Sequence, residues 1–279
     1  MTALRLPADP RLFQIAVLSG LLIYGLSALD LALDPTTALV ILLTAETTQW
    51  LASRWVGCRF DPRSPLISAL SLCLLLRTAT PVWGMVAAVV AIGGKFVIRV
   101  RGKHVFNPAN LGLVVTMVLT DAAWVSPGQW GTVMTVAVSL VLLGMLVTRR
   151  AERDDVTWAF LVAWATILGT RAWWLGDPLS IPLHQLQNGA LLIFAFFMIS
   201  DPKTTPDHRA GRVVYAVWVA TLGAVLEFVF FVPAALIWAL ALSAPIVPLL
   251  DLWLPALRYR WPSFSSSSTR STRSVMEAV

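Results

Sequence analysis

Long apolar segments occupy almost the whole chain, and they limit the fold more than any other feature. Of the 279 residues, 57% are hydrophobic and 13% are charged, about half of the roughly 25% charge typical of a soluble domain. A helix needs about 20 apolar residues to cross a bilayer, so the chain can cross it about ten times. This composition excludes a soluble enzyme and a disordered chain. We attribute the net charge of +6 to orientation in a lipid bilayer rather than to a nucleic-acid partner.

Charged residues and prolines divide the apolar sequence into ten segments. The sequence therefore predicts an all-α integral membrane protein with about ten transmembrane helices. The predicted segments are 12–33, 36–53, 65–79, 81–100, 107–123, 129–148, 156–175, 184–200, 212–231 and 233–252.

The positions of the basic residues predict the orientation of these helices. If the N-terminus is cytoplasmic, 19 of the 21 Lys and Arg residues fall on the inner side, and only Arg77 and Arg171 fall outside. Such a bias is the usual sign of cytoplasmic loops. We therefore expect both termini in the cytoplasm, with residues 256–279 as a flexible basic tail.

A shift of 125 residues aligns the chain with itself. Thr80-Pro81 then matches Thr205-Pro206, and the segment 106–111 (FNPANL) matches 231–236 (FVPAAL). Five helices per half is an odd number, so the halves 1–125 and 126–255 are predicted to be inverted repeats. This architecture recurs in membrane transporters, with functional sites at the repeat interface.

Two polar turns with prolines are predicted to converge on the cytoplasmic side. Asn107 is a good N-cap for a helix that begins at Pro108, and its free N–H groups could bind a phosphate, a carboxylate or a flavin carbonyl. In the second turn, Asp201 and Thr205 precede prolines and therefore leave the helical region. The alternative for the first turn is an ordinary helix start at a membrane interface.

Both turns carry a resemblance to a known family. The segments 102–110 (GKHVFNPAN) and 200–206 (SDPKTTP), the latter followed by Gly211-Arg212, resemble the RnfD/NqrB family, whose members belong to the Rnf complex and to the Na+-translocating NADH:quinone oxidoreductase. Shorter similarities lie at 68–76, 188–191 and 244–251. The resemblance implies a multi-pass protein of the bacterial cytoplasmic (inner) membrane that holds flavin and passes electrons. It also implies other membrane or redox subunits as partners, and coupling to Na+ or H+ movement.

The cofactor that the resemblance implies is riboflavin or FMN, bound non-covalently. Family members attach one flavin to the threonine of a Ser-Gly-Ala-Thr sequence, which this chain lacks. Its nearest fragment, Thr78-Ala79-Thr80-Pro81, lies in a different loop, so the chain resembles shortened, stand-alone relatives of RnfD (UnbU-like proteins). The expected cofactor-binding residues are His104, Phe106, Asn107, Asn110, Asn188, Asp201, Lys203 and Thr205.

Three ionisable residues fall inside predicted helices, where charge is costly and often functional. Glu46, Glu227 and Lys95 are therefore candidates for an ion pathway. The alternative is structural pairing of Glu46 with Arg77 and of Glu227 with Arg171. The histidine and cysteine spacing predicts no metal site, and no catalytic residue is identified.

Three functions remain open from the sequence. The first is a non-catalytic electron-transport subunit of a membrane oxidoreductase that uses non-covalent flavin. The second is a transporter of a small molecule or ion, with the inverted repeat providing alternating access. The third is a membrane scaffold for partner redox proteins.

Overall fold

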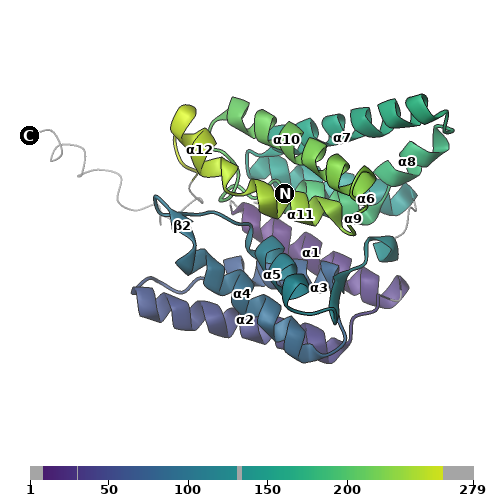
Figure 1. Cartoon of the computed structure of the whole chain (residues 1–279). Helices are drawn as coiled ribbons and strands as arrows, with labels where there is room; N and C mark the ends of the chain where they lie inside the picture. The colour runs from purple at the N-terminus through teal and green to yellow at the C-terminus, as the bar shows by residue number, and fades with distance from the viewer. Residues whose placement is uncertain (1–8, 30, 131–133, 260–279) are drawn as a thin grey trace, which may run out of the picture.

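Helices form most of the chain in the computed structural model, which describes residues 9–29, 31–130 and 134–259 (Figure 1). The predicted tail lies largely outside these residues. The first half contains α1 (Pro10–Ala28), α2 (Pro35–Val56), α3 (Arg63–Leu75), β1 (Leu76–Thr78), α4 (Pro81–Val97), β2 (Arg99–Val100), β3 (Lys103–His104), α5 (Pro108–Leu119) and β4 (Ala123–Val125). The second contains η1 (Pro127–Trp130), α6 (Met134–Arg150), α7 (Asp154–Leu175), α8 (Ser180–Leu186), α9 (Gly189–Ile193), the π-helix η2 (Phe194–Met198), α10 (Arg209–Phe228), α11 (Ala235–Ser243) and α12 (Ile246–Trp253).

Each of the ten predicted segments contains helix, but few of the described helices are long enough to cross a membrane alone. By length and hydropathy α1 and α10 qualify, and two bent pairs would raise the number to four. The predicted segment 184–200 is one such pair, because the chain bends by 47° between α8 and α9. The predicted segment 233–252 bends by the same angle between α11 and α12. Pro245 lies at that bend, where it cannot donate a helical hydrogen bond.

Local capping explains where several helices begin. Pro10, Pro35 and Pro108 each occupy the first turn, and the side chains of Asp9, Asp34 and Asn107 accept hydrogen bonds from backbone N–H groups there. These contacts satisfy donors that have no partner within the helix. The predicted helix start at Pro108 is confirmed.

Corresponding helices of the two halves pack in corresponding pairs. In the first half α4 packs on α2 and α5, and in the second α10 packs on α7 and α11. Gly112 lets α5 lie close to α4, since a Cβ atom there would be 2.6 Å from the carbonyl oxygen of Ala87. The halves touch through α5 with α11 and α1 with α6, and Figure 1 shows one half stacked on the other.

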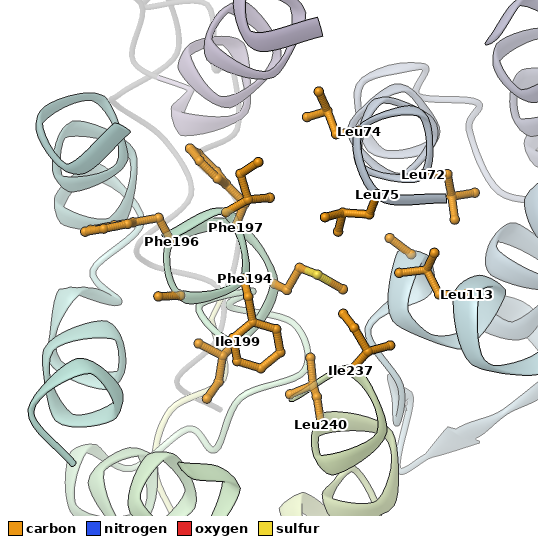
Figure 2. Close-up of a cluster of buried hydrophobic side chains, with 14 of the residues drawn as sticks. Leu72, Leu74, Leu75, Leu113, Phe194, Phe196, Phe197, Ile199, Ile237 and Leu240 are labelled. Carbon is orange, nitrogen blue, oxygen red and sulfur yellow. The ribbon is translucent and has the colours of Figure 1, made fainter. Parts of the chain in front are cut away.

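The short helices meet in the apolar centre of the molecule. Figure 2 shows leucines of α3 and α5 facing phenylalanines of η2 and aliphatic residues of α11. Labelled in this cluster are Leu72, Leu74, Leu75, Leu113, Phe194, Phe196, Phe197, Ile199, Ile237 and Leu240, all buried. The predicted repeat interface is therefore a packed hydrophobic core.

The connections gather at two ends of the bundle. At one end, which we call the basic end, lie the start of α1, the β2–β3 hairpin, the α6–α7 connection and the segment 199–208, joined by hydrogen bonds and ion pairs. At the opposite end, β1 pairs with β4 in an antiparallel sheet. The expectation of an all-α fold thus holds except for these four short strands.

Candidate functional site

The two predicted polar turns do converge, at the basic end. Asn107 Nδ2 donates to the carbonyl oxygen of Met198, 3.2 Å away, and lies 3.4 Å from Asp201 Oδ2. Its Oδ1 accepts from the backbone N–H of Asn110. One side chain therefore caps α5 and holds the end of η2 against it.

The π-helix and the turn after it are satisfied by polar side chains. Thr157 donates to the carbonyl oxygen of Ala195, and Ser200 donates to that of Phe196. After the break, Asp201 Oδ1 accepts from the backbone N–H of Lys203, and the Asp201 carbonyl accepts from Thr205. Irregular backbone between apolar helices is tolerated when protein groups satisfy it in this way.

A lysine that was not predicted as a site residue ties the hairpin to this turn. Lys103 Nζ donates to the carbonyl oxygen of Thr205 (2.7 Å), Asp207 Oδ1 (3.1 Å) and Asp251 Oδ2 (2.9 Å). Thr205 Oγ1 accepts from Arg153 Nε at 3.1 Å. Its backbone and hydroxyl are therefore used in structural contacts.

A polar cavity of about 60 Å³ lies between the two turns. Four predicted cofactor residues, His104, Asn107, Asp201 and Lys203, line it together with Arg11 and serines of α3. Phe106, Asn110 and Thr205 do not. Small-molecule pockets measure roughly 300–1,000 Å³, whereas a water molecule needs about 10–15 Å³ on this measure. The cavity is thus the size of a few waters.

Burial controls the charge of the cavity lining. Desolvation lowers the pKa of His104 to about 4, and the cations Lys95, Arg99 and Lys203 outweigh the opposing attraction of Asp201. Burial also lowers the pKa of Lys203, against the same attraction of Asp201. His104 is therefore neutral at pH 7, and Asp201 supplies the negative charge of the lining.

Four charged residues close the bundle beside this cavity. Arg11 bonds to Asp9 and Asp61, both at 2.8 Å, and Arg63 bonds to the same two carboxylates at 2.7 and 2.8 Å. Burial alone would raise the pKa of Asp61, but hydrogen bonds from Arg63 and Arg11 bring it down to about 2. This cluster was not predicted from the sequence, because its pairs join residues about 50 positions apart.

A larger cavity lies at the opposite end. It measures about 320 Å³ and contains Asn188, the remaining predicted cofactor residue. Trp164 and Phe194 contribute aromatic surface, and Glu227 and Gln185 contribute polar groups. Asn188 Oδ1 caps α9 by accepting from the N–H of Ala190. The predicted cofactor residues therefore divide between two ends of the protein.

The two expected structural ion pairs do not form. Arg77 donates to the carbonyl oxygens of Cys73, Leu74 and Leu76 at the end of α3, and to Gln129 Oε1, 2.6 Å away. Arg171 lies 3.9 Å from Asp177 and 4.5 Å from the centre of the Phe228 ring. Glu46 and Glu227 are thus left without an ion pair among the described residues.

Comparisons with known proteins agree with the predicted family. The model of the NQR2, RnfD, RnfE family matches residues 118–259, about half of the chain. The D-type subunit of the ion-translocating oxidoreductase complex from Halorhodospira halophila (strain DSM 244 / SL1) is 24% identical, over 84% of this chain and 85% of the relative. The protein of the same description in Pseudomonas aeruginosa (strain LESB58) is 26% identical, over 89% and 90% respectively.

Proposed function

Because the chain belongs to the NQR2, RnfD, RnfE family, we propose that it is a membrane electron-transport subunit that binds a flavin non-covalently. Relatives that match most of the chain are D-type subunits of an ion-translocating oxidoreductase complex. By this proposal the protein lies in the bacterial cytoplasmic membrane and works with other membrane or redox subunits. The basic end faces the cytoplasm, in keeping with the excess of Lys and Arg on that side.

The cavity at the opposite end carries the proposal. Its volume of about 320 Å³ falls within the usual range for small-molecule pockets, whereas about 60 Å³ at the basic end does not. We therefore place the flavin beside Asn188 and Glu227 rather than between His104 and Thr205. Carbonyl and N–H groups of a flavin would find partners in Glu227, Gln185 and Asn188.

The aromatic wall of this cavity supports a planar ligand. Trp164 and Phe194 line the cavity and belong to a larger cluster, in which the Phe160 ring centre lies 6.2 Å from that of Trp164 and 5.1 Å from that of Phe194. Neighbouring rings fix the orientation of these two side chains, and rigid aromatic faces favour stacking. A bound flavin would supply the transfer of one or two electrons, and the protein would supply its position and electrostatic environment.

Non-covalent binding follows from the sequence of this chain. Ser-Gly-Ala-Thr does not occur in it. Thr80, the nearest threonine to that pattern, precedes α4 and does not line the 320 Å³ cavity. We therefore expect flavin to leave the protein when it is denatured.

We also propose that residues 1–125 and 126–255 are inverted repeats. The corresponding helices start at comparable positions after the shift of 125 residues, with α4 at Pro81 and α10 at Arg209, for example. The two cavities are related in the same way. Asn107, Pro108 and Ala109 line one, and the matching Val232, Pro233 and Ala234 line the other. Related cavities at opposite ends also support the transporter alternative, in which each end opens in turn.

Absorption spectroscopy of the purified protein tests the proposed function. We expect a flavin spectrum in detergent solution and release of free flavin on acid denaturation. Colourless protein, purified from cells with ample riboflavin and unable to take up added riboflavin or FMN, contradicts the proposal. Substrate uptake by proteoliposomes without flavin would then favour a transporter. Co-purification with redox proteins alone would favour a scaffold.

A further inference from the structure

A buried lysine connects the cavity at the basic end to the interior of the first half. Lys95, near the end of α4, is only 7% exposed. Its Nζ donates a hydrogen bond to Ser64 Oγ, 3.1 Å away, and Ser64 lines the 60 Å³ cavity. The ammonium group is therefore one hydrogen bond from a space that holds water.

A carboxylate with a free oxygen lies on the other side of this lysine. Gly84 packs against Thr37 and Ile41, so α2 and α4 run side by side, and Lys95 is level with Gln49 about three turns further on. Helical side chains point back toward the N-terminus, which directs Lys95 toward Glu46. Glu46 Oε2 and Gln49 Oε1 are buried and have no hydrogen-bond partner among the described residues.

The charges around Lys95 favour a proton over a sodium ion. Asp201, Glu46 and Asp61 attract the ammonium group, so the lysine occupies the place where a metal cation would be held. Arg11 and Lys203 in the cavity wall also repel metal ions. A proton, by contrast, can pass along hydroxyl groups and water. Hydroxyl groups in the cavity lining come from Ser64, Ser68, Ser71, Thr148 and Ser200.

We propose that this cavity, Ser64 and Lys95 form a proton half-channel that leads from the basic end to Glu46. In the proposed transfer, the Lys95 ammonium gives one proton to the Glu46 carboxylate, leaving a neutral amine and a carboxylic acid. The amine then takes a proton from a hydronium ion in the cavity, which restores the ammonium. The net result is one proton moved from the cavity to Glu46.

The half-channel deepens the proposed function by naming the ion and its route, and it rests on that function only for the source of the driving force. Its own chemistry needs no flavin. Other charged or titratable groups near the route are Asp61 before α3, Arg99 and His104 in the hairpin, and Asp201 and Lys203 after η2. The test must therefore isolate the Glu46 carboxyl from these groups.

Infrared spectroscopy after a pH jump follows that one group directly. The full chain is reconstituted in vesicles of phosphatidylethanolamine and phosphatidylglycerol, and the carboxylic C=O band of Glu46 is assigned by its loss in Glu46→Gln. We expect Lys95→Met to slow the appearance of this band by roughly 10²-fold, the size of a lost proton-transfer group. Ser64→Ala should also slow it, and Ser64→Thr, which keeps the hydroxyl, should not.

Several outcomes overturn the half-channel. One is an unchanged rate in both Lys95→Met and Ser64→Ala, and another is the lack of any Glu46 band down to the pH at which the protein unfolds. A shift of the band when Na+ replaces choline shows Na+ ligation instead. Glu227 at the other end provides an internal control, because its band should keep its rate in Lys95→Met. If Lys95→Met fails to fold, Ser64→Ala decides. Flavin content does not enter these measurements, so this inference and the proposed function can fail separately.

Discussion

Asn110 on α5 donates a hydrogen bond from its side-chain Nδ2 to the backbone carbonyl oxygen of Ile237 on α11, 2.9 Å away. Asn110 is 1% exposed, and the bond joins the two halves of the chain beside the core. The carbonyl of Ile237 lies near the start of α11, at the rim of the larger cavity. A residue predicted to bind a cofactor thus serves as a link between the halves.

Replacing this amide should weaken the contact between the halves. Asn110→Leu keeps the size of the side chain but leaves the Ile237 carbonyl without its donor, which costs about 1–3 kcal/mol in a buried site. We expect a lower unfolding temperature in detergent, measured by circular dichroism. Thr116→Val on the same helix is the matched control, because Thr116 Oγ1 is buried without a partner among the described residues. Equal losses in the two variants would contradict the role given to Asn110.

Arg77 should be needed for the stability of the opposite end. Its guanidinium caps the last carbonyls of α3 and is 1% exposed. Arg77→Met removes several buried charge-assisted hydrogen bonds, and we expect a loss of at least about 3 kcal/mol. Arg77→Lys should recover part of it. Arg171→Met is the control, because that side chain is 42% exposed and an exposed ion pair contributes about 0–1 kcal/mol. If both methionine variants are equally stable, Arg77 is not a structural cap.

The sequence could predict those features that depend on neighbouring residues. The start of α5 follows from the capping chemistry of Asn107 and Pro108, and the meeting of the two polar turns follows from counting helices and sorting charges. The bend in the tenth predicted segment had a signal in Pro245, which an apolar count alone does not use. In the same way, Asn188 marks the start of a helix inside a stretch that the apolar count treats as one segment.

Features that depend on tertiary packing could not be predicted. The contact of Lys103 with Asp207 and Asp251 joins residues more than 100 positions apart, and no local pattern specifies it. The volume of each cavity is set by side chains from several helices, such as Phe196 and Phe197 beside the smaller one. The sequence therefore found the polar residues at the basic end but not how little space they enclose.

His104 should make stability depend on pH. Burial lowers its pKa from 6.5 to about 4, so between these values the unfolded chain binds more protons than the folded protein does. Its contribution to stability is complete above about pH 6.5 and is lost as the pH falls toward 4. We expect His104→Gln to show a shallower fall of unfolding temperature than the wild type between about pH 7 and 4.5. Asp61, whose pKa falls from 3.8 to about 2, acts only below that range. Parallel curves would show that His104 is not the group responsible.

The location proposed for flavin predicts opposite results for variants at the two ends. Trp164 lines the 320 Å³ cavity, and Trp164→Leu removes an aromatic face there. We expect bound flavin to dissociate at least about tenfold more readily, which corresponds to roughly 1.4 kcal/mol. Trp218→Leu on α10 is the control, because Trp218 is 48% exposed and does not line this cavity. Asp201→Asn at the basic end should retain its flavin. Titration of apoprotein with riboflavin, followed by quenching of flavin fluorescence, measures all three. Loss of binding in Asp201→Asn with full binding in Trp164→Leu would move the flavin to the basic end, where the cavity would have to open to admit it.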